Sequence, residues 1–537
     1  MKPDPTAQPL KPSPTAAATD DGDLSQQAQA QDAAPASDSP GSSVAKNAGF
    51  LMGSHLLTWS MSLVLLVFLP RYLGPTDVGR FHFANAIWYM VAVFVAFGTD
   101  TLITKQVARQ PAAAGDLFGV AVALRTILFA LGYVGTTIFL RIFDYPPETT
   151  TVVAIVGVSF LILQVANVCQ ATIIGLEQMS VISLANIASK LVLTAAAILM
   201  LVSGRGVYAV AGVIVLSSLV SMIIQLNHLA RRYRLRVRFD PGAMRRLAQA
   251  SLPYLMSMVF LVVYMQVDIV IISLLVDEKA VGWYGTADQL FGTLLFIPSI
   301  FVTAIFPRFA RLHVDAPNSL GKSMAKSFEM LLLLSVPLGL GMVVIAEPLV
   351  QILFGPAFFE SGLILAVFGV VLILTYQNIL LGQFLISTDR QNAWTVVMAI
   401  ATVATIPLDF LFIPWCNRVL ANGPVGGAMA FVVTETGMMV AGLFLLPAGT
   451  LGRAQAWTAL RIGFAGVMMA AVIWQVREQM IVVPILLGAA LYLGMILLLR
   501  VIPAEDWALL KSTGRQILHR STPAALEATA AQPAKSV

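Results

Sequence analysis

The sequence has few charged residues and few residues that bind metals. Only 11% of the 537 residues are charged, whereas 58% are hydrophobic, and the chain has two cysteines and five histidines. A soluble domain carries about 25% charged residues, so the composition argues against a water-soluble fold. Two cysteines in or beside apolar runs form neither a disulfide framework nor a metal site. The nucleotide-binding pattern GxxxxGK[ST] is also missing, so we expect no ATP-driven transport, no cofactor and no metal.

Long apolar runs are abundant instead. Many are about 20 residues long, the length at which a helix crosses roughly 30 Å of hydrocarbon. The ten-residue alternation of a membrane β-barrel is not seen. We therefore predict an all-α integral membrane protein with about fourteen transmembrane helices, at 48–69, 81–99, 117–140, 151–174, 181–203, 207–228, 251–275, 283–306, 328–346, 361–387, 393–414, 425–447, 457–475 and 480–501.

The two ends of the chain differ from the rest. Residues 1–45 are mainly Pro, Ala, Ser, Gln and Asp, and the last residues are similar. Such segments cannot bury enough apolar surface to fold. We predict disordered cytoplasmic tails at 1–45 and 503–537. No signal peptide is predicted, because no basic stretch precedes a short apolar core.

The basic residues predict the orientation in the membrane. With the N-terminus in the cytoplasm, 24 of the 33 Lys and Arg residues fall on the cytoplasmic side, 7 fall outside, and Arg125 and Lys190 lie inside spans. Cytoplasmic loops of membrane proteins are enriched in Lys and Arg. We therefore predict a multi-pass protein of the bacterial cytoplasmic (inner) membrane with both termini inside. The basic run "RRYRLRVRF" at 231–239 fits an inside loop, and it could also hold anionic lipid headgroups.

A short motif occurs twice. "DVGRFHFANAIWY" at 77–89 resembles "AVGWYGTADQLFG" at 280–292, with Val78-Gly79 matching Val281-Gly282 and Asn85 matching Asp288. Later segments continue the match, so spans 1–6 and 7–12 form two copies of one unit. Because six is even, both copies enter the membrane from the same side and are parallel repeats. We predict six-helix bundles at 46–240 and 241–450 around a central cleft, followed by two extra helices at 451–502.

The residues at 69–110, "LPRYLGPTDVGRFHFANAIWYMVAVFVAFGTDTLITKQVARQ", resemble the opening of Wzx-type polysaccharide flippases, a branch of the multidrug/oligosaccharidyl-lipid/polysaccharide exporter superfamily. "QVDIVIISLLVDEKAVGWYGTADQLFG" at 266–292 resembles the start of that family's second half. The resemblance covers about residues 45–500. It implies a flippase that moves an undecaprenyl-pyrophosphate-linked oligosaccharide to the outer leaflet for O-antigen, capsule or exopolysaccharide synthesis.

The resemblance also implies partners. These are the lipid-linked oligosaccharide, membrane lipid, a polysaccharide polymerase and a chain-length regulator; nucleic acid is not expected. Two alternatives stay open. One is a cation-coupled multidrug antiporter of the same superfamily. The other is a membrane-embedded glycosyltransferase or polymerase. Such an enzyme needs a large catalytic loop outside the membrane or a group of carboxylates at a membrane face, and it is disfavoured because the longest connecting loop is only about 20 residues.

Ionisable residues inside the membrane are costly and usually face a cavity or a partner. Arg125 and Lys190 are predicted to bind the substrate diphosphate, although either could instead pair with an acid. Polar residues suited to sugar hydroxyls or to contacts between helices are Asn85, Gln164, Asn167, Gln170, Asn186, Gln266, Gln289, Gln377, Asn378 and Gln383. Of these, Asn85 and Asn186 are selected as substrate-binding candidates.

The acidic residues inside spans lie in the second half. Asp268, Asp288 and Glu435 are candidates for a proton or sodium site that couples transport to an ion gradient, because a carboxylate out of water holds a proton or pairs with a cation. Asp268 could instead have a structural role, and Glu435 could pair within the bundle. Asp409 is expected to be solvated near the outer surface and is not included.

Overall fold

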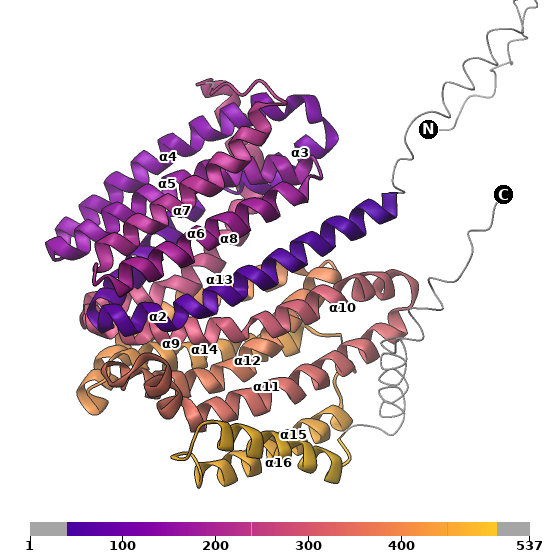
Figure 1. The fold of residues 1–537 in the computed structure, drawn as a ribbon. Helices are drawn as coiled ribbons and strands as arrows, with labels where there is room; N and C mark the ends of the chain where they lie inside the picture. Colours follow the sequence, from indigo (N-terminus) through magenta and orange to yellow (C-terminus); the bar gives the residue numbers. More distant parts are fainter. Residues whose placement is uncertain (1–39, 238, 448, 502–537) are drawn as a thin grey trace, which may run out of the picture.

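The computed structural model describes residues 40–237, 239–447 and 449–501, and this part of the chain is helical without strands (Figure 1). The helices are α2 (Pro40–Ala96), α3 (Thr99–Arg109), α4 (Ala114–Ile142), α5 (Pro147–Gly175), α6 (Met179–Val202), α7 (Val207–Ala230), α8 (Pro241–Leu275), α9 (Glu278–Leu294), α10 (Phe296–Asp315), α11 (Pro317–Phe354), α12 (Ser361–Ser387), α13 (Gln391–Leu420), α14 (Pro424–Leu445), α15 (Arg453–Trp474) and α16 (Val482–Leu498). Short 3-10 turns, η1 (Pro111–Ala113) and η2 (Pro356–Phe358), precede α4 and α12.

The predicted all-α membrane fold is confirmed. Within the described residues, twelve helical stretches are long and apolar enough to cross a membrane. One of them is bent in the middle, and α16, with 17 residues, is a shorter apolar helix. The count of about fourteen spans stays a prediction. The predicted tail at 503–537 and residues 1–39 lie outside the described residues, whereas 40–45 begin α2.

The bend in α2 lies at Gly74, between the first two predicted spans. Gly74 has a φ of 73°, which glycine adopts without the steric cost of a Cβ atom. Pro75 follows, and a proline ring removes a backbone donor and clashes with the preceding turn. Together they divide α2 into two arms. The second arm carries the first copy of the repeated motif.

Two aspartates start helices in the second half. The Asp240 side chain accepts hydrogen bonds from the backbone N–H groups of Gly242 and Ala243 at the start of α8, at 2.9 and 3.1 Å. Asp277 accepts one from Ala280 at the start of α9, at 2.7 Å. Each carboxylate satisfies donors that have no partner in the first turn of a helix. The second repeated motif therefore begins at a capped helix end.

The helices form two groups joined through α2. In the first group α5 packs on α7, and α6 packs on α2 and α7; in the second, α11 packs on α12 and α13 packs on α14. Figure 1 shows α4 to α7 together, α11, α12 and α14 together, and α2 in indigo between them. The second arm of α2 contacts α9, so the two copies of the motif meet at the junction of the groups.

The last two helices attach to the second group through α11. Both α15 and α16 contact α11 and each other. A separate apolar cluster holds them there, in which Val336 and Val344 of α11 meet Ile462 and Met469 of α15 and Ile496 of α16. The domain boundaries predicted from the sequence, including the parallel relation of the two six-helix units, stay predictions.

Candidate functional site

The two copies of the motif are in direct contact. A Cβ atom at Gly79 would meet the backbone of Glu278 and Gly282, and one at Gly282 would meet the backbone of Pro75 and Gly79. Pro75 and Glu278, like Gly79 and Gly282, are 203 positions apart, which is the offset between the motif copies. Reciprocal contacts of this kind are what a two-fold relation produces. Only glycine at both positions lets the two backbones approach so closely.

The same relation continues one turn further along both helices. His82 and Gly285 are again 203 positions apart, and the His82 ring occupies the space that a Cβ atom at Gly285 would need. The next turn carries Asn85 on α2 and Asp288 on α9. These two side chains line a cavity of about 420 Å³. The close glycine contact therefore ends where the cavity begins.

Ion pairs and hydrogen bonds stabilise the contact between the motif copies on the side of the glycines that faces away from the cavity. Arg80 Nε donates to Glu278 Oε2 at 2.8 Å, and Arg80 Nη1 donates to Asp77 Oδ1 at 3.0 Å. Thr149, at the start of α5, donates to the second oxygen of Glu278. Arg71 Nε donates to the carbonyl oxygen of Leu353 at 2.7 Å, near the end of α11. The two helix groups are thus held together at this end, which the charge pattern predicts to face outward.

The cavity below this contact brings together three of the predicted site residues. Asn85 and Asp288 share it with Lys190 of α6. Among the described residues, neither Lys190 nor Asp288 forms an ion pair. The other polar residues in its wall are Ser62, His82, Tyr89, Gln266 and Gln289. Lys190 is half-buried, and an ammonium partly out of water without a partner charge is costly, so the space beside it suits a negatively charged group.

Lys190 also lines a second cavity, of about 410 Å³. Asn186, one helical turn before Lys190, lies in its wall together with Ser189 and Ser217. Ser62 and Lys190 line both cavities, so the two spaces adjoin. The structure therefore brings Asn85, Lys190, Asp288 and Asn186 into one connected region. This arrangement combines residues from both halves of the sequence.

Arg125 lies apart from this region. Its side chain is 2% exposed, and Nη2 donates to Asp100 Oδ1 and to Thr99 Oγ1, both at 2.6 Å. Nη1 donates to the backbone and side-chain oxygens of Gln164, both at 3.3 Å. This is the ion pair that the sequence left open as an alternative. A guanidinium with its donors used in this way orients its neighbours and does not itself line either cavity around Lys190.

Asp268 lies in the core of the second group. The hydroxyl of Tyr284 donates to Asp268 Oδ2 at 2.6 Å, and Oδ1 is buried without a hydrogen-bond partner among the described residues. Asp409 of α13 lies beside it and has no exposed surface. The expectation that Asp409 is solvated near the surface is therefore wrong. Helix α13 turns this residue into the bundle, where α8 and α14 cover it.

Glu435 occupies a third position, also within the second group. It is 2% exposed. The hydroxyl of Tyr264 donates to its Oε1 at 3.0 Å, and Asn378 Nδ2 donates to its Oε2 at 2.7 Å. Tyr264 is one turn before Asp268 on α8, so the two acidic positions lie along the same side of that helix. Asp288 thus lines the cavity, whereas Asp268 and Glu435 are buried in the core of the second group.

Sequence reasoning missed several of these residues. Asp100, the partner of Arg125, follows a predicted span and carries no periodic signal. Glu278 stands beside the second motif but has no counterpart charge in the first copy. His82 lies in the first motif, yet its matching residue is Gly285. The repeat itself was the available signal, because positions that match across a two-fold relation meet at its axis.

The comparison with known families decides which family the chain is in. The model for the family described as polysaccharide biosynthesis protein matches residues 44–313, which is half of the chain. The chain belongs to this family. The matched region contains the first helix group, both copies of the motif and the start of the second group.

Relatives of this polysaccharide biosynthesis family member include two proteins that are described as probable flippases. The chain is 28% identical over 287 residues to a probable lipid II flippase MurJ of Vibrio cholerae, which covers 49% of this chain and 53% of that protein. This chain therefore matches about half the length of that relative. It is 21% identical over 369 residues to Agl15 of Haloferax volcanii, a probable low-salt glycan biosynthesis flippase, covering 68% of this chain and 75% of that protein.

Solved structures show the same fold. Lipid II flippase MurJ in an inward closed conformation superposes with a TM-score of 0.65 at 14% identity, covering 84% of this chain and 97% of that one. An inward-facing multidrug resistance MATE family transporter superposes with a TM-score of 0.57 at 14% identity, covering 77% and 94%. At these identities the likeness concerns the fold, and this family member is a multi-pass membrane protein.

Proposed function

We propose that the protein is a flippase for a lipid-linked oligosaccharide. Its substrate class is an undecaprenyl-pyrophosphate-linked repeat unit, and its product is the same molecule in the outer leaflet, ready for O-antigen, capsule or exopolysaccharide assembly. The observation that carries the proposal is the unpaired Lys190 in a cavity at the junction of the two helix groups. The family membership and the two flippase relatives support the same reading.

Lys190 supplies the charge that a diphosphate needs. An ammonium out of water binds a phosphate oxygen as a point charge without a geometric requirement. Asn85, Gln266 and Gln289 in the same wall offer amide donors to further oxygens. A cavity of about 420 Å³ suits the diphosphate and the first sugar rather than the whole molecule. The polyprenyl chain would remain in the bilayer.

The contact at Gly79 and Gly282 supports an alternating-access mechanism. It seals the cavity on one side, so substrate enters from the opposite side while the contact holds and leaves after it opens. Parallel repeats permit this by rocking of one bundle against the other around a fixed site. The orientation we propose places both termini and the open side in the cytoplasm, with the protein in the inner membrane.

Carboxylates in the second group are proposed to couple transport to a cation. Adjacent carboxylates such as Asp268 and Asp409 cannot both remain charged out of water, so they hold a proton or a cation between them. Asp288 in the cavity and Glu435 beside Asn378 are further candidates. A proton and a sodium ion are both proposed as candidate coupling ions.

A multidrug antiporter is the second candidate. Asp288 favours it, because an unpaired carboxylate in the cavity would attract a cationic compound. Lys190 opposes it, since this ammonium lines both adjoining cavities and repels cations.

Transport of an intact lipid, without a covalent step, makes the protein a transporter and not an enzyme. A polymerase and a chain-length regulator are the proposed downstream partners.

Flipping in reconstituted vesicles tests the proposal. Purified protein is placed in proteoliposomes with undecaprenyl pyrophosphate that carries a fluorescent trisaccharide, and a membrane-impermeant quencher reports the leaflet. We expect transfer that Lys190→Ala reduces strongly. Efflux of ethidium from the same vesicles should stay at the protein-free rate. Ethidium transport without lipid transfer would overturn the flippase in favour of the antiporter.

A further inference from the structure

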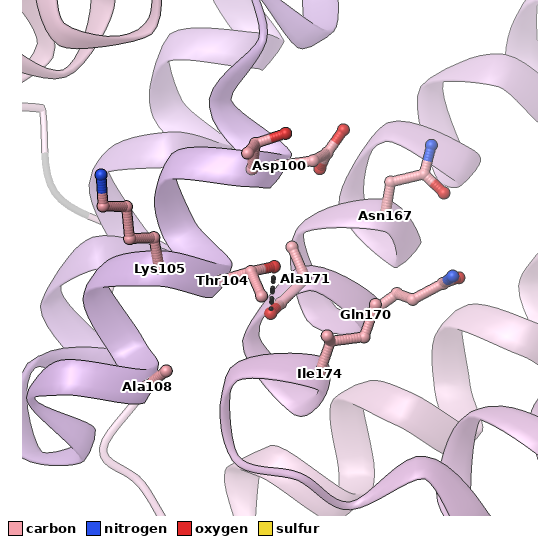
Figure 2. A pocket seen from close by; sticks show the side chains of 9 residues that line it. Asp100, Thr104, Lys105, Ala108, Asn167, Gln170, Ala171 and Ile174 are labelled. Carbon is pink, nitrogen blue, oxygen red and sulfur yellow. Dashed lines mark hydrogen bonds between the residues drawn. The ribbon is translucent and has the colours of Figure 1, made fainter. Parts of the chain in front are cut away.

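A third cavity, of about 680 Å³, lies in the first helix group away from Lys190. Two helices form its walls. Asp100, Thr104 and Lys105 come from one side of α3, and Asn167 and Gln170 come from α5 (Figure 2). Thr104 ties the helices together, because its hydroxyl donates to the carbonyl oxygen of Ala171 at 3.0 Å.

The polar groups in this cavity are available to a ligand. Asn167 and Gln170 make no hydrogen bond to any other described side chain or backbone group, and Lys105 makes no ion pair there. Placing polar side chains of this kind against lipid costs free energy. We therefore expect this side of α3 and α5 to face water. Two amides offer donors and acceptors, Lys105 only donors, and Asp100 only acceptors.

Arg125 holds the carboxylate of Asp100, one of the polar groups in this cavity, in a fixed orientation. It binds Asp100 through one carboxylate oxygen, at 2.6 Å, while 45% of the Asp100 side chain stays exposed. Thr99 and Gln164 hold the guanidinium in place from the buried side. The Asp100 carboxylate is thus fixed on one oxygen and open to the cavity on the other; Figure 2 shows it extending from α3 toward the side of Asn167. This explains a buried arginine that the Lys190 region does not use.

The chemistry of the wall suits neutral hydroxyl groups. Arg125 balances the charge of Asp100, so Lys105 carries the remaining charge in the described wall, and most of the other polar groups there are neutral amides and hydroxyls. Carboxylate, amide and ammonium groups together bind molecules that donate and accept at neighbouring positions, as sugar hydroxyls do. Ala108, Ala171 and Ile174 add apolar surface for the C–H face of a sugar ring.

We propose that this α3–α5 cavity is a carbohydrate subsite that receives the glycan part of the substrate, an inference that rests on the flippase function. Its place fits: Asp100 follows Asn85 by fifteen residues, and because α2 ends at Ala96 and α3 begins at Thr99, the two positions are at most about 30 Å apart. A glycan of several sugars can extend toward this cavity while its diphosphate lies at Lys190. Asn167 and Gln170 bind hydroxyls, and Arg125 is a positioning residue.

Binding of two lipids to the detergent-purified full-length protein tests the subsite. One lipid is bare undecaprenyl pyrophosphate, and the other carries a trisaccharide of N-acetylhexosamine and hexose units. We expect wild type to bind the glycosylated lipid more tightly. Asn167→Ala and Gln170→Ala should each weaken that binding about three- to tenfold, the effect of one lost hydrogen bond, and leave the bare lipid unchanged.

Three further variants sharpen the test. Gln106→Ala removes an amide from the same helix α3 at a position outside the cavity and should change neither affinity. Ala108→Trp fills the cavity without removing a polar group and should weaken only the glycosylated lipid. Lys190→Ala should weaken both lipids equally.

The outcomes separate the two proposals. If the variants Asn167→Ala, Gln170→Ala and Ala108→Trp leave the glycosylated lipid bound as in wild type, the subsite is wrong while the flippase proposal stands. The same holds if wild type shows no preference for the glycosylated lipid, or if both lipids weaken together. If wild type binds neither lipid, the flippase proposal fails and the subsite fails with it.

Discussion

Gly79 and Gly282, which occupy the same position in two copies of one motif, press against each other across the junction of the helix groups. Each lacks the Cβ atom that would strike the partner's backbone. The contact joins equivalent positions of the internal repeat, and we propose that it closes the cavity on one side.

Enlarging either glycine should disrupt this closure. Gly282→Leu forces the backbones apart, and overpacking of this kind costs about 1–3 kcal/mol. We expect loss of lipid transfer in vesicles with the protein still present in the membrane. Gly212→Ala on α7 is the control, because a Cβ atom there meets nothing within 4 Å. Normal transfer by Gly282→Leu would show that the close approach is not needed.

The ion pair between Arg80 and Glu278 should stabilise the same closed state. In a chain with Cys169 and Cys416 replaced by alanine, a cysteine substituted for Asn85 reports access to the cavity. Glu278→Gln should speed its labelling by a maleimide added from outside. Glu148→Gln, which removes a carboxylate 3.9 Å from Arg80 with a side chain 51% exposed, should have a smaller effect. Equal labelling rates in both variants would argue against this role.

Lys190 should act through its charge. Lys190→Ala is expected to abolish surface polysaccharide in cells that depend on this protein, whereas Lys190→Arg should retain part of it, since the positive charge remains. Lys322→Ala, an exposed change at the start of α11, should have no effect. Full export by Lys190→Ala would remove the basis of the diphosphate site.

The buried carboxylates should determine the dependence on cations. Asp409→Asn keeps the shape of the side chain but cannot exchange a proton or hold a cation as a charge. We expect transfer that no longer responds to a sodium or pH gradient across the vesicle membrane. Asp389→Asn, at a position whose side chain is 90% exposed, should respond as wild type does. A gradient response that survives Asp409→Asn would place the coupling elsewhere, with Asp288 and Glu435 next to be tested.

The orientation can be tested by reporter fusions. Reporters joined after residues 235 and 520 should both lie in the cytoplasm, and one joined after residue 145 should lie outside, because Lys and Arg are enriched in inside loops. A cytoplasmic signal at 145 would contradict the charge argument. It would also reverse the side on which we expect the substrate to enter.

The sequence predicted the helices well because the need to cross hydrocarbon dictates their length and composition. The predicted span at 117–140 lies within α4, and the one at 361–387 coincides with α12. It could not predict which charges would meet. Arg125 and Asp100 pair from different helices, and nothing in the spacing of 25 residues indicates that they face each other.

Burial was misjudged at one position for a similar reason. Asp409 was expected near the surface because it lies toward the end of a predicted span. Which side of α13 faces the bundle depends on the packing of α8 and α14, and an almost uniformly apolar helix gives no periodic signal for it. The repeated motif lies at the junction of the helix groups, a contact that was not predicted from the sequence although equivalent positions converge at a two-fold axis.

The attachment of α15 and α16 to α11 has a practical consequence. These helices form their own apolar cluster with one helix of the second group, so we expect them to move together with that group. A probe on α15 and another on α4 would report the distance between the two groups without altering any residue of the cavities around Lys190. Labels on the last two helices would therefore allow the opening and closing of the two groups to be followed over time.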